Sequence, residues 1–242
     1  MTAAVAPEGA VAPEVVVAAP AVVAIKPGVA PKVAVTPKGA VTPKGERRRY
    51  ALVTAAADLL CEGGFEAVRH RAVARRAGLP LASTTYYFSS LDDLIASAVA
   101  HIGMVEIAQL RARVTTLSRR RRGSDTTADL LVDLLVGGES EPRLTEQLIS
   151  RYERHIACAR LPALREIQRR NMRQRVDAIG DVIDRSGRSA RPELVSALIC
   201  TVDGAVVSAL VDDHQDPRSV ARATVIDVID AVAPVDGQPV QI

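Results

Sequence analysis

Apolar residues recur at helical spacing through most of the 242-residue chain. Between residues 46 and 233 they return every three or four positions, and Gly, Pro and Ser interrupt the runs, as is typical of amphipathic helices. No stretch shows the period of two that is typical of a half-buried strand. The pattern predicts helices over nine ranges: 47–62, 67–77, 81–88, 91–117, 125–137, 142–159, 162–186, 191–212 and 217–233.

These helices fall into two groups, so we expect an all-α protein with two structured domains. The predicted segments are a disordered tail over 1–45, a three-helix domain over 46–92, a larger helical domain over 93–234 and a disordered tail over 235–242. Ser89 and Ser90 precede two aspartates, which predicts an N-cap for the long fourth helix that joins the domains.

The first 45 residues have a different composition. They are built from Ala, Val, Pro, Gly and Lys, in loose repeats such as VAPE, VAPK and VTPKG. Regular prolines prevent a helix or a central strand, so we expect a disordered, partly polyproline-like tail. Two roles fit this composition: a solvated extension, or a weakly cationic arm that touches DNA phosphates.

Composition limits the chemistry of the protein. The net charge of +3 permits a nucleic-acid partner without requiring one. Cys61, Cys158 and Cys200 are far apart and form no CxxC pair, so neither a disulfide framework nor a zinc cage is expected. We expect no metal or other cofactor, and a reducing cytoplasm is the simplest location. His155 and Cys158 share a helix face, but one such pair is weak support for a metal site.

Neither apolar run predicts a membrane partner. The segment 15–25 is too short to span a bilayer and contains Pro20, and the first residues lack the basic start of a cleaved signal. The run 194–211 contains Asp203 near its middle, which favours a buried helix.

The stretch AVARRAGLPLASTTYYF, residues 72–88, joins two short predicted helices through a tight turn. Gly78 supplies the left-handed backbone that the turn needs, and Leu79 is placed to fill the space between the helices. A helix, a Gly-containing turn and a second helix are the elements of a helix-turn-helix, which presents its second helix to a DNA groove.

The second helix of this unit carries small and hydroxyl side chains: Ala82, Ser83, Thr84 and Thr85. Small residues permit close approach, and hydroxyls bond phosphates or base edges. Tyr86 and Tyr87 reach further toward phosphate oxygens, although Tyr87 also fits a core position. The flanking arginines available to neutralise phosphates are Arg47, Arg48, Arg49, Arg69, Arg71, Arg75 and Arg76. For Arg75 and Arg76 a solvated helix face is the alternative.

Residues 46–100 resemble the DNA-binding domain of the TetR family of bacterial transcriptional regulators. The matching segments are YALVTAAADLLCEGGF, AVARRAGLP and STTYYFSSLDDLI. The resemblance implies a short recognition helix that ends at a core Phe88, and a long fourth helix leading to a ligand-binding body. With the residue chemistry above, it assigns DNA contacts to Arg47, Arg48, Arg49, His70, Arg71, Ala82, Ser83, Thr85, Tyr86 and Tyr87.

Some positions depart from the family pattern. Arg69 stands where the family usually has a Thr or Ser N-cap, and Thr85 where it has a phosphate-binding tyrosine. Leu91 replaces a frequent lysine, which removes one phosphate contact, and Pro80 and Leu81 replace a polar pair. These changes leave the expected fold intact.

The range 191–212 is richer in apolar residues than one core face requires: Leu194, Val195, Leu198, Ile199, Val202, Val206 and Leu210. Such excess predicts a helix buried on two sides. The family resemblance implies that the last two helices pair with a second subunit as a four-helix bundle. We therefore expect a homodimer that reads a pseudo-palindromic operator in double-stranded DNA.

By the same resemblance, an unknown small-molecule effector binds among the helices of the body. The candidate contacts are Met104, Tyr152, His155 and Asp203, each of which also fits an ordinary core or surface position. The scarcity of aromatic residues argues against a pocket that stacks flat multi-ring ligands. We predict solvated segments at two charged stretches: Arg119–Arg122 and the DDHQD sequence at 212–216.

The leading hypothesis is a ligand-released transcriptional repressor, and activator action stays open. The alternative is a non-specific, nucleoid-associated DNA-binding protein whose tail supplies affinity. An enzyme is disfavoured because the chain lacks a GxSxG, a P-loop and a GxGxxG after a strand, and its four histidines are scattered.

Overall fold

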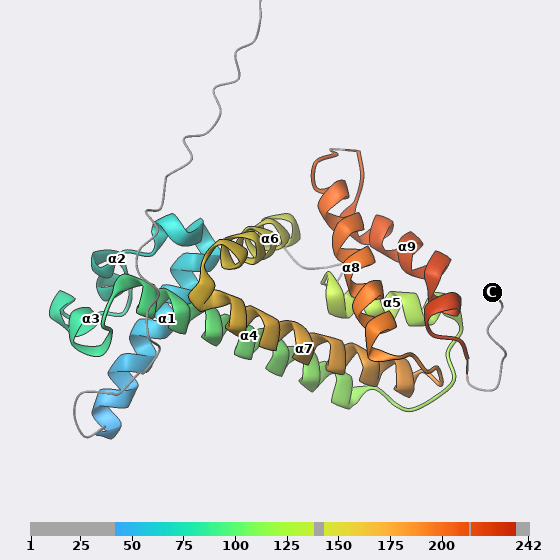
Figure 1. Ribbon diagram of the computed structural model, residues 1–242, viewed down its shortest axis with the longest axis horizontal. Coiled ribbons are helices and arrows are strands. Elements are labelled where there is room, and N and C mark those ends of the chain that lie inside the picture. Colours follow the sequence, from blue (N-terminus) through green and yellow to red (C-terminus); the bar gives the residue numbers. More distant parts are fainter. Residues whose placement is uncertain (1–41, 138–142, 213, 236–242) are drawn as a thin grey trace, which may run out of the picture. The chain divides into compact units, whose positions relative to one another are not determined.

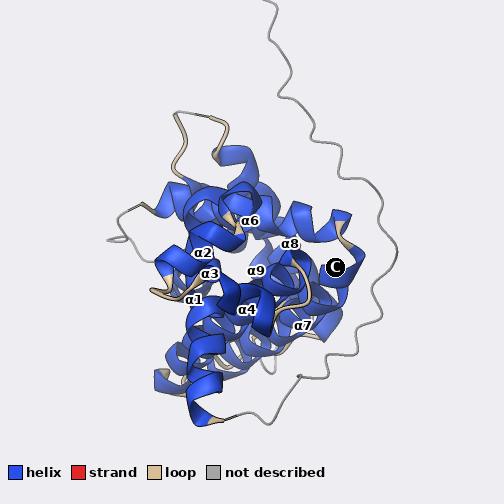
Figure 2. Cartoon of the chain, turned by 90° about the vertical axis from the view of Figure 1, so that its left-hand side faces the viewer, coloured by secondary structure: helices blue, strands red, loops and turns tan. Residues whose placement is uncertain are grey.

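The computed structural model describes residues 42–137, 143–212 and 214–235, and in these ranges the chain is almost entirely helical (Figure 1). The helices are α1 (Pro43–Ala67), α2 (His70–Arg76), α3 (Leu81–Tyr87), α4 (Leu91–Thr116), α5 (Ser124–Leu135), α6 (Leu144–Arg160), α7 (Pro162–Arg185), α8 (Pro192–Ala209) and α9 (Pro217–Val232). Figure 2 shows helices and loops but no strand in the described part. The predicted all-α class is confirmed.

Helix α1 begins at Pro43, before the predicted domain boundary at residue 46. Thr42 Oγ1 accepts a hydrogen bond of 3.1 Å from the Gly45 amide, and proline suits the first turn because its missing N–H needs no partner there. Residues 43–45, assigned to the tail from sequence, therefore form the first helical turn. The expected disorder of residues 1–41 lies outside the described residues.

The predicted break at Gly63 and Gly64 is present as a bend, and Gly64 has a φ of 64°. The helix nevertheless continues to Ala67. As a result α2 starts at His70, later than predicted, and its N-cap Arg69 makes no side-chain capping hydrogen bond.

The turn between α2 and α3 has the predicted geometry. Gly78 has a φ of 63°, in the left-handed region that favours glycine, and Leu79 is half-buried against the neighbouring core. The chain leaves α3 through a buried Phe88. Ser90 Oγ then accepts a hydrogen bond of 3.1 Å from the Asp93 amide, which is the N-cap that the sequence predicts for α4.

Helices α1 to α4 enclose one hydrophobic core, to which α6 and α7 each add a side chain. Its members include Leu52, Leu60, Val73, Phe88, Leu94, Val99, Cys158 and Leu164. Because the ends of α6 and α7 pack here, the three-helix unit is not sealed off from the body.

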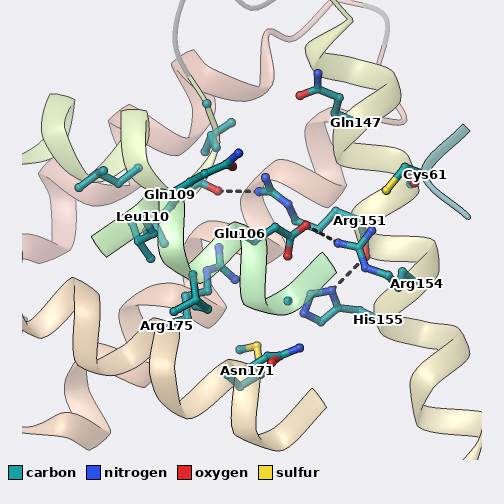
Figure 3. Close-up of a pocket in the computed structure, with 18 of the residues that line it drawn as sticks. Cys61, Glu106, Gln109, Leu110, Gln147, Arg151, Arg154, His155, Asn171 and Arg175 are labelled. Atoms are coloured by element: carbon teal, nitrogen blue, oxygen red, sulfur yellow. Dashed lines mark hydrogen bonds and ion pairs between the residues drawn. The ribbon is translucent and has the colours of Figure 1, made fainter. Parts of the chain in front are cut away.

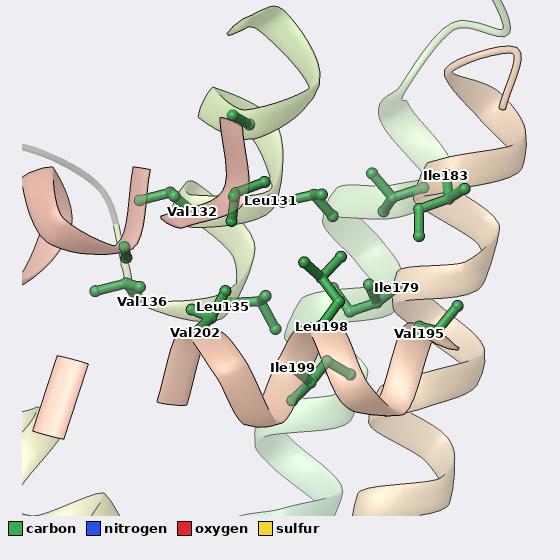
Figure 4. Packing of buried hydrophobic residues seen from close by; sticks show 14 of the residues in the cluster. Leu131, Val132, Leu135, Val136, Ile179, Ile183, Val195, Leu198, Ile199 and Val202 are labelled. Carbon is green, nitrogen blue, oxygen red and sulfur yellow. The ribbon is translucent and has the colours of Figure 1, made fainter. Parts of the chain in front are cut away.

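A second core lies in the body, among α4, α5, α7, α8 and α9 (Figure 4). In the close-up, Leu131 and Leu135 of α5 and Ile179 and Ile183 of α7 surround the side chains of α8, of which Leu198 is central. By length and composition alone, α8 is the one described helix that is apolar enough to cross a membrane. Only a third of this helix is buried, on the side that faces this core, so packing within the chain accounts for one of the two buried sides that the sequence predicts.

The segment 119–122, predicted to be solvated, is partly buried. Arg122 is only 6% exposed. Its guanidinium donates to the main-chain carbonyls of Ser118, Arg120 and Arg185 at 2.9–3.3 Å. The prediction failed for Arg122 because free carbonyls at the ends of α4 and α7 offer acceptors that no local sequence pattern reveals.

A second buried arginine lies close by, just after the end of α7. Arg188, 1% exposed, lies 2.7 Å from Asp230 of α9 and also donates to the Ala233 carbonyl. The hydrogen bonds from Arg188 and then Ser124 lower the pKa of the Asp230 carboxyl. Next to it, Val235 forms an antiparallel bridge with Arg188, so this residue, assigned to the C-terminal tail from sequence, is paired.

Candidate nucleic-acid interface and ligand cavity

Helix α3 presents three of the predicted contact residues to solvent. Ala82, Thr85 and Tyr86 are exposed, and Tyr86 retains 70% of its accessible surface. Ser83 is half-buried. Thr84, which the sequence pattern placed with this group, is fully buried, and its hydroxyl donates to the Leu81 carbonyl at 2.8 Å. Thr84 is therefore a core residue and not a groove contact.

The aromatic residues at the end of α3 divide into core and surface. Tyr87 is half-buried against the N-terminal core, and its ring meets that of Tyr86 edge to face, with centroids 4.9 Å apart. The Arg49 guanidinium lies 5.2 Å from the centre of the buried Phe88 ring. This stacking links the exposed start of α1 to the end of the recognition helix.

Exposed cationic side chains lie on α1 and α2. Arg47, Arg48 and Arg49 of α1 and Arg71 of α2 are all exposed. Two other arginines of this region pair with glutamates: Arg69 with Glu66, and Arg76 with Glu62 at 2.6 Å.

The hydrogen bond from Arg76 lowers the pKa of the Glu62 carboxyl. An arginine that already has a carboxylate partner has less to gain from a phosphate, so Arg69 and Arg76 are weaker candidates for DNA contact. His70 is half-buried at the start of α2, and its Nδ1 is buried without a hydrogen-bond partner.

A cavity of about 770 Å³ lies among α4, α5, α6 and α7 (Figure 3). Helix α4 lines it with Gly103, Glu106 and Leu110, and α6 with Arg151, Arg154 and His155. From α7, Asn171 and Arg175 face the same space. The volume falls within the range of small-molecule sites, roughly 300–1,000 Å³.

Two of the cavity arginines have carboxylate partners. Arg154, 7% exposed, lies 2.5 Å from Glu106. Arg175 holds Asp203 of α8 through two hydrogen bonds of 2.8 and 3.0 Å, and the Tyr152 hydroxyl donates to the same carboxylate at 3.1 Å. Burial, and then the Asp203 charge, raise the pKa of the Tyr152 hydroxyl.

Arg151 has a different environment. Arg151 donates to the main-chain carbonyl of Leu135 at 2.7 Å, and no carboxylate of the described chain lies within ion-pair distance of it. Burial, and then the nearby Arg175 charge, lower the pKa of the Arg151 guanidinium.

His155 lies one helical turn from Arg151 and accompanies it at the cavity wall. The Nδ1–H donates to the Arg151 carbonyl at 3.0 Å, since a carbonyl can only accept. Nε2 is buried without a partner. Burial lowers the pKa of this imidazole.

Two family models match the chain. Residues 52–98 match the model described as bacterial regulatory proteins, tetR family, and residues 122–231 match the model described as tetracyclin repressor-like, C-terminal domain. The chain belongs to the TetR family. It is thus a DNA-binding helix-turn-helix transcriptional regulator from a non-enzymatic family, as the sequence predicts. A comparison with curated protein sequences found no match.

Solved structures of other regulators share the fold. The transcriptional regulator SCO7518 from Streptomyces coelicolor A3(2) is 24% identical, with a TM-score of 0.59 over 75% of this chain and 98% of its own. The multidrug binding protein EbrR is 26% identical, with a TM-score of 0.57 over 75% and 94%. A transcriptional regulator from Saccharomonospora viridis is 17% identical, with a TM-score of 0.60 over 78% and 98%.

The four residues that sequence reasoning proposed for effector binding have separate positions in this TetR-family chain. His155 lines the cavity. Tyr152 and Asp203 are joined by a hydrogen bond behind Arg175, one layer away from the cavity. Met104 is 55% exposed and does not line the cavity. The structure therefore brings three of the four together but only one to the cavity wall.

Sequence reasoning missed the cavity arginines. The sequence RYERH, residues 151–155, places Arg151, Arg154 and His155 at positions i, i+3 and i+4, on one face of α6. That spacing was a usable signal for a cationic helix face. Arg175 had no comparable local signal, because its partner Asp203 lies 28 residues further along the chain.

Proposed function

We propose that this TetR-family regulator is a homodimeric repressor that a small-molecule effector releases from a pseudo-palindromic operator. One observation carries the proposal: the helix that lines the cavity also anchors the recognition helix. Helix α4 begins at Leu91, four residues after α3 ends at Tyr87, and contributes Gly103, Glu106 and Leu110 to the cavity. A ligand that displaces α4 would therefore displace α3, and the operator and the effector would favour different states of one element.

The surface of α8 supports a dimer. Five of the seven apolar residues that suggested a two-sided helix are buried in the core of the chain itself, and Leu194 and Leu210 are half-buried. Another set of residues supplies the exposed face: Ala197, Cys200, Thr201, Gly204, Val207 and Ser208 of α8, continued by Val211 just after the helix. This face is uncharged and formed of small or apolar side chains, as is typical of helix packing between subunits.

Two copies related by a twofold axis through this face would present two α3 helices. Successive major grooves on one side of the duplex are about 34–36 Å apart, so a dimer reads two half-sites. On this proposal the protein acts in the cytoplasm, at the nucleoid when bound to DNA.

Relatives support a small-molecule effector. EbrR has been solved with imidazole, proflavin, ethidium and malachite green, and the S. viridis regulator with choline. The cavity of this chain is large enough for ligands of that size class.

Selection of bound fragments from genomic DNA tests the DNA-binding part of the proposal. We expect a pseudo-palindromic site, bound at least 1,000-fold more tightly than random duplex at physiological salt, roughly the lower limit for specific regulators. Equal affinities with a steep salt dependence would instead support the non-specific, nucleoid-associated alternative. A reporter placed behind the selected operator distinguishes repression from activation.

Light scattering tests the dimer. We expect Val207→Asp, which places a charge on the exposed α8 face, to shift the chain from dimer to monomer. The matched control is Ile156→Asp on α6, since Ile156 is also exposed, at 60%, but lies outside that face. A monomeric wild type, or a dimer that survives Val207→Asp but not Ile156→Asp, contradicts the proposed interface.

A further inference from the structure

The cavity has an imbalance of charge. Four arginines line it, namely Arg113, Arg151, Arg154 and Arg175, against two acidic residues, Glu106 and Asp133. Both acids already have partners, because Glu106 pairs with Arg154, and Asp133 lies 2.7 Å from Arg218. Among the described residues, no lining carboxylate remains for Arg113 or Arg151. Arg113 is exposed to solvent and donates to the Asp133 main-chain carbonyl at 2.8 Å, whereas Arg151 is half-buried.

Arg151 is the centre of this imbalance. One nitrogen of its guanidinium, Nη1, donates to the Leu135 carbonyl, and a guanidinium carries five N–H donors in a planar fork. Removing a cation from water without an anionic partner is unfavourable. In Figure 3 the side chain of Arg151 extends from α6 into the cavity. The group is therefore placed to receive a planar anion from a ligand.

The rest of the wall restricts what else the ligand carries. Amide side chains of Gln109, Gln147 and Asn171 offer further donors, and Ile107, Leu110 and Met172 form an apolar part. Among the described residues, none that lines the cavity is Phe, Tyr or Trp. Quaternary ammonium ligands are typically held by aromatic faces, so this wall is poorly suited to them.

We propose that the effector is a small organic carboxylate with an aliphatic body, whose carboxylate pairs with the Arg151 guanidinium. This inference rests on the proposed function for the site's role as an effector site. A carboxylate is favoured over a phosphate ester because Arg151 is, in the described chain, the one half-buried lining arginine without a carboxylate partner and matches one negative charge, whereas a phosphate monoester carries about 1.5–2 at neutral pH. The guanidinium fork matches a carboxylate through two parallel hydrogen bonds.

Calorimetric titration of the full chain with four six-carbon probes tests the head group. The probes are hexanoate, hexyl phosphate, hexanamide and hexyltrimethylammonium, which share the chain and differ in charge. We expect hexanoate to bind at least tenfold more tightly than the other three, since hydrogen bonds between a guanidinium and a carboxylate are stronger than those to a neutral group. Tighter binding of the ammonium, amide or phosphate probe, or no binding of hexanoate at millimolar concentration, overturns the inference.

Substitution locates the binding group. Arg151→Gln should weaken hexanoate binding at least tenfold, and Arg151→Lys should retain part of it. Arg160→Gln removes the same charge from an exposed position on the same helix, outside the cavity wall, and should bind hexanoate as the wild type does. Equal losses in Arg151→Gln and Arg160→Gln would show a general charge effect and overturn the assignment. Because Arg151 has no carboxylate partner, its removal leaves no buried anion unpaired, so we expect the variant to fold. The probe series on the wild type tests the head group independently of this variant.

Operator binding, followed by fluorescence anisotropy, separates the two proposals. If the protein binds its operator and hexyltrimethylammonium rather than hexanoate releases it, the proposed function stands and the carboxylate inference falls. If hexanoate binds as expected but no DNA fragment is bound specifically, the proposed function falls while the anion preference of the cavity stands.

Discussion

The N-terminal helices and the cavity are both rich in arginine, but the two regions place the guanidinium group in opposite environments. Arg47, Arg48 and Arg71 are exposed near α3. Around the cavity, Arg154 is 7% exposed, and it pairs with a carboxylate, as Arg175 does. An exposed arginine is hydrated, so it needs no protein partner before DNA binds. A buried arginine has lost that hydration, and an unpaired charge there lowers the stability of the fold. Substitutions should therefore affect DNA binding in the first region and stability in the second.

The largest effect is expected at the carboxylate that holds α6, α7 and α8 together. Asp203→Asn removes the charge that pairs with Arg175 and accepts from Tyr152. We expect the free energy of unfolding, measured by urea denaturation, to fall by about 3 kcal/mol, because a partly buried guanidinium loses its counter-charge. Glu62→Gln breaks the exposed pair with Arg76 and should cost less than about 1 kcal/mol. Similar losses of stability in both variants would contradict the expected difference between buried and exposed ion pairs.

A smaller loss is expected where α4 passes close to α7. A Cβ atom at Gly103 would lie 2.0 Å from the amide nitrogen of Asn171. Gly103→Ala should therefore displace Asn171 and lower the free energy of unfolding by about 1–2 kcal/mol, since overpacking outweighs the gain in helix propensity. The control is Gly180→Ala, where nothing lies within 4 Å and we expect a gain of about 0.5–1 kcal/mol. Equal gains at both positions would show that the Asn171 side chain rotates away without cost and would contradict the expected overpacking.

In the N-terminal region the expected effect is on affinity alone. Tyr86→Ala and Thr85→Ala should each weaken operator binding by about tenfold, the value of one lost hydrogen bond to a charged group. Their melting temperatures should stay close to that of the wild type, because both side chains are exposed. Thr84→Ala is the contrasting variant, since its buried hydroxyl should report on stability. Unchanged operator affinity in both exposed variants would refute the assignment of α3 as the reading helix.

Salt dependence separates two arginines of α2. Arg71 has no carboxylate within ion-pair distance among the described residues, whereas Arg76 pairs with Glu62. Arg71→Ala should reduce the slope of log affinity against log salt by about 1, the contribution of one phosphate contact. Arg76→Ala should leave that slope unchanged. The reverse result would mean that the Glu62 pair opens on DNA.

The smallest effect is a pH dependence in the body. Burial lowers the pKa of His155 in the folded chain below that in the unfolded chain. As pH falls through about 6.5, the unfolded chain binds a proton that the folded chain binds only at lower pH, so the free energy of unfolding decreases. His155→Gln should flatten this slope between pH 7.5 and 5.5, whereas His214→Gln, at an exposed turn, should not. A wild-type stability that is constant across this window would contradict the burial of His155.

The DNA-binding unit was largely accessible from sequence because its signals are local. Gly78 marks a left-handed turn, Ser90 an N-cap, and the spacing of apolar residues the helix faces. The failures are also instructive. Thr84 has the same side-chain chemistry as Thr85, and only the packing of α3 decides that one is buried and the other exposed.

The larger helical domain also has features that the sequence predicted and features that it did not. Helical periodicity predicted its helices to within a few residues, and the apolar richness of 191–212 predicted a core helix. The cavity was not predictable, because it is formed by residues of five helices, α1 and α4 to α7. Of the four candidates chosen by residue type, only His155 lines it.

By itself, the sequence determined the helical class, the helix-turn-helix and the family of this protein. The signals for these three features are local, because each signal lies within one helix or one turn. The tertiary structure alone decided which of the buried and half-buried cavity arginines have a carboxylate partner. Arg175 meets Asp203, Arg154 meets Glu106, and Arg151 meets only a carbonyl. Those pairings join residues 28 and 48 positions apart. Helix packing, which no local pattern encodes, therefore sets the charge of the cavity.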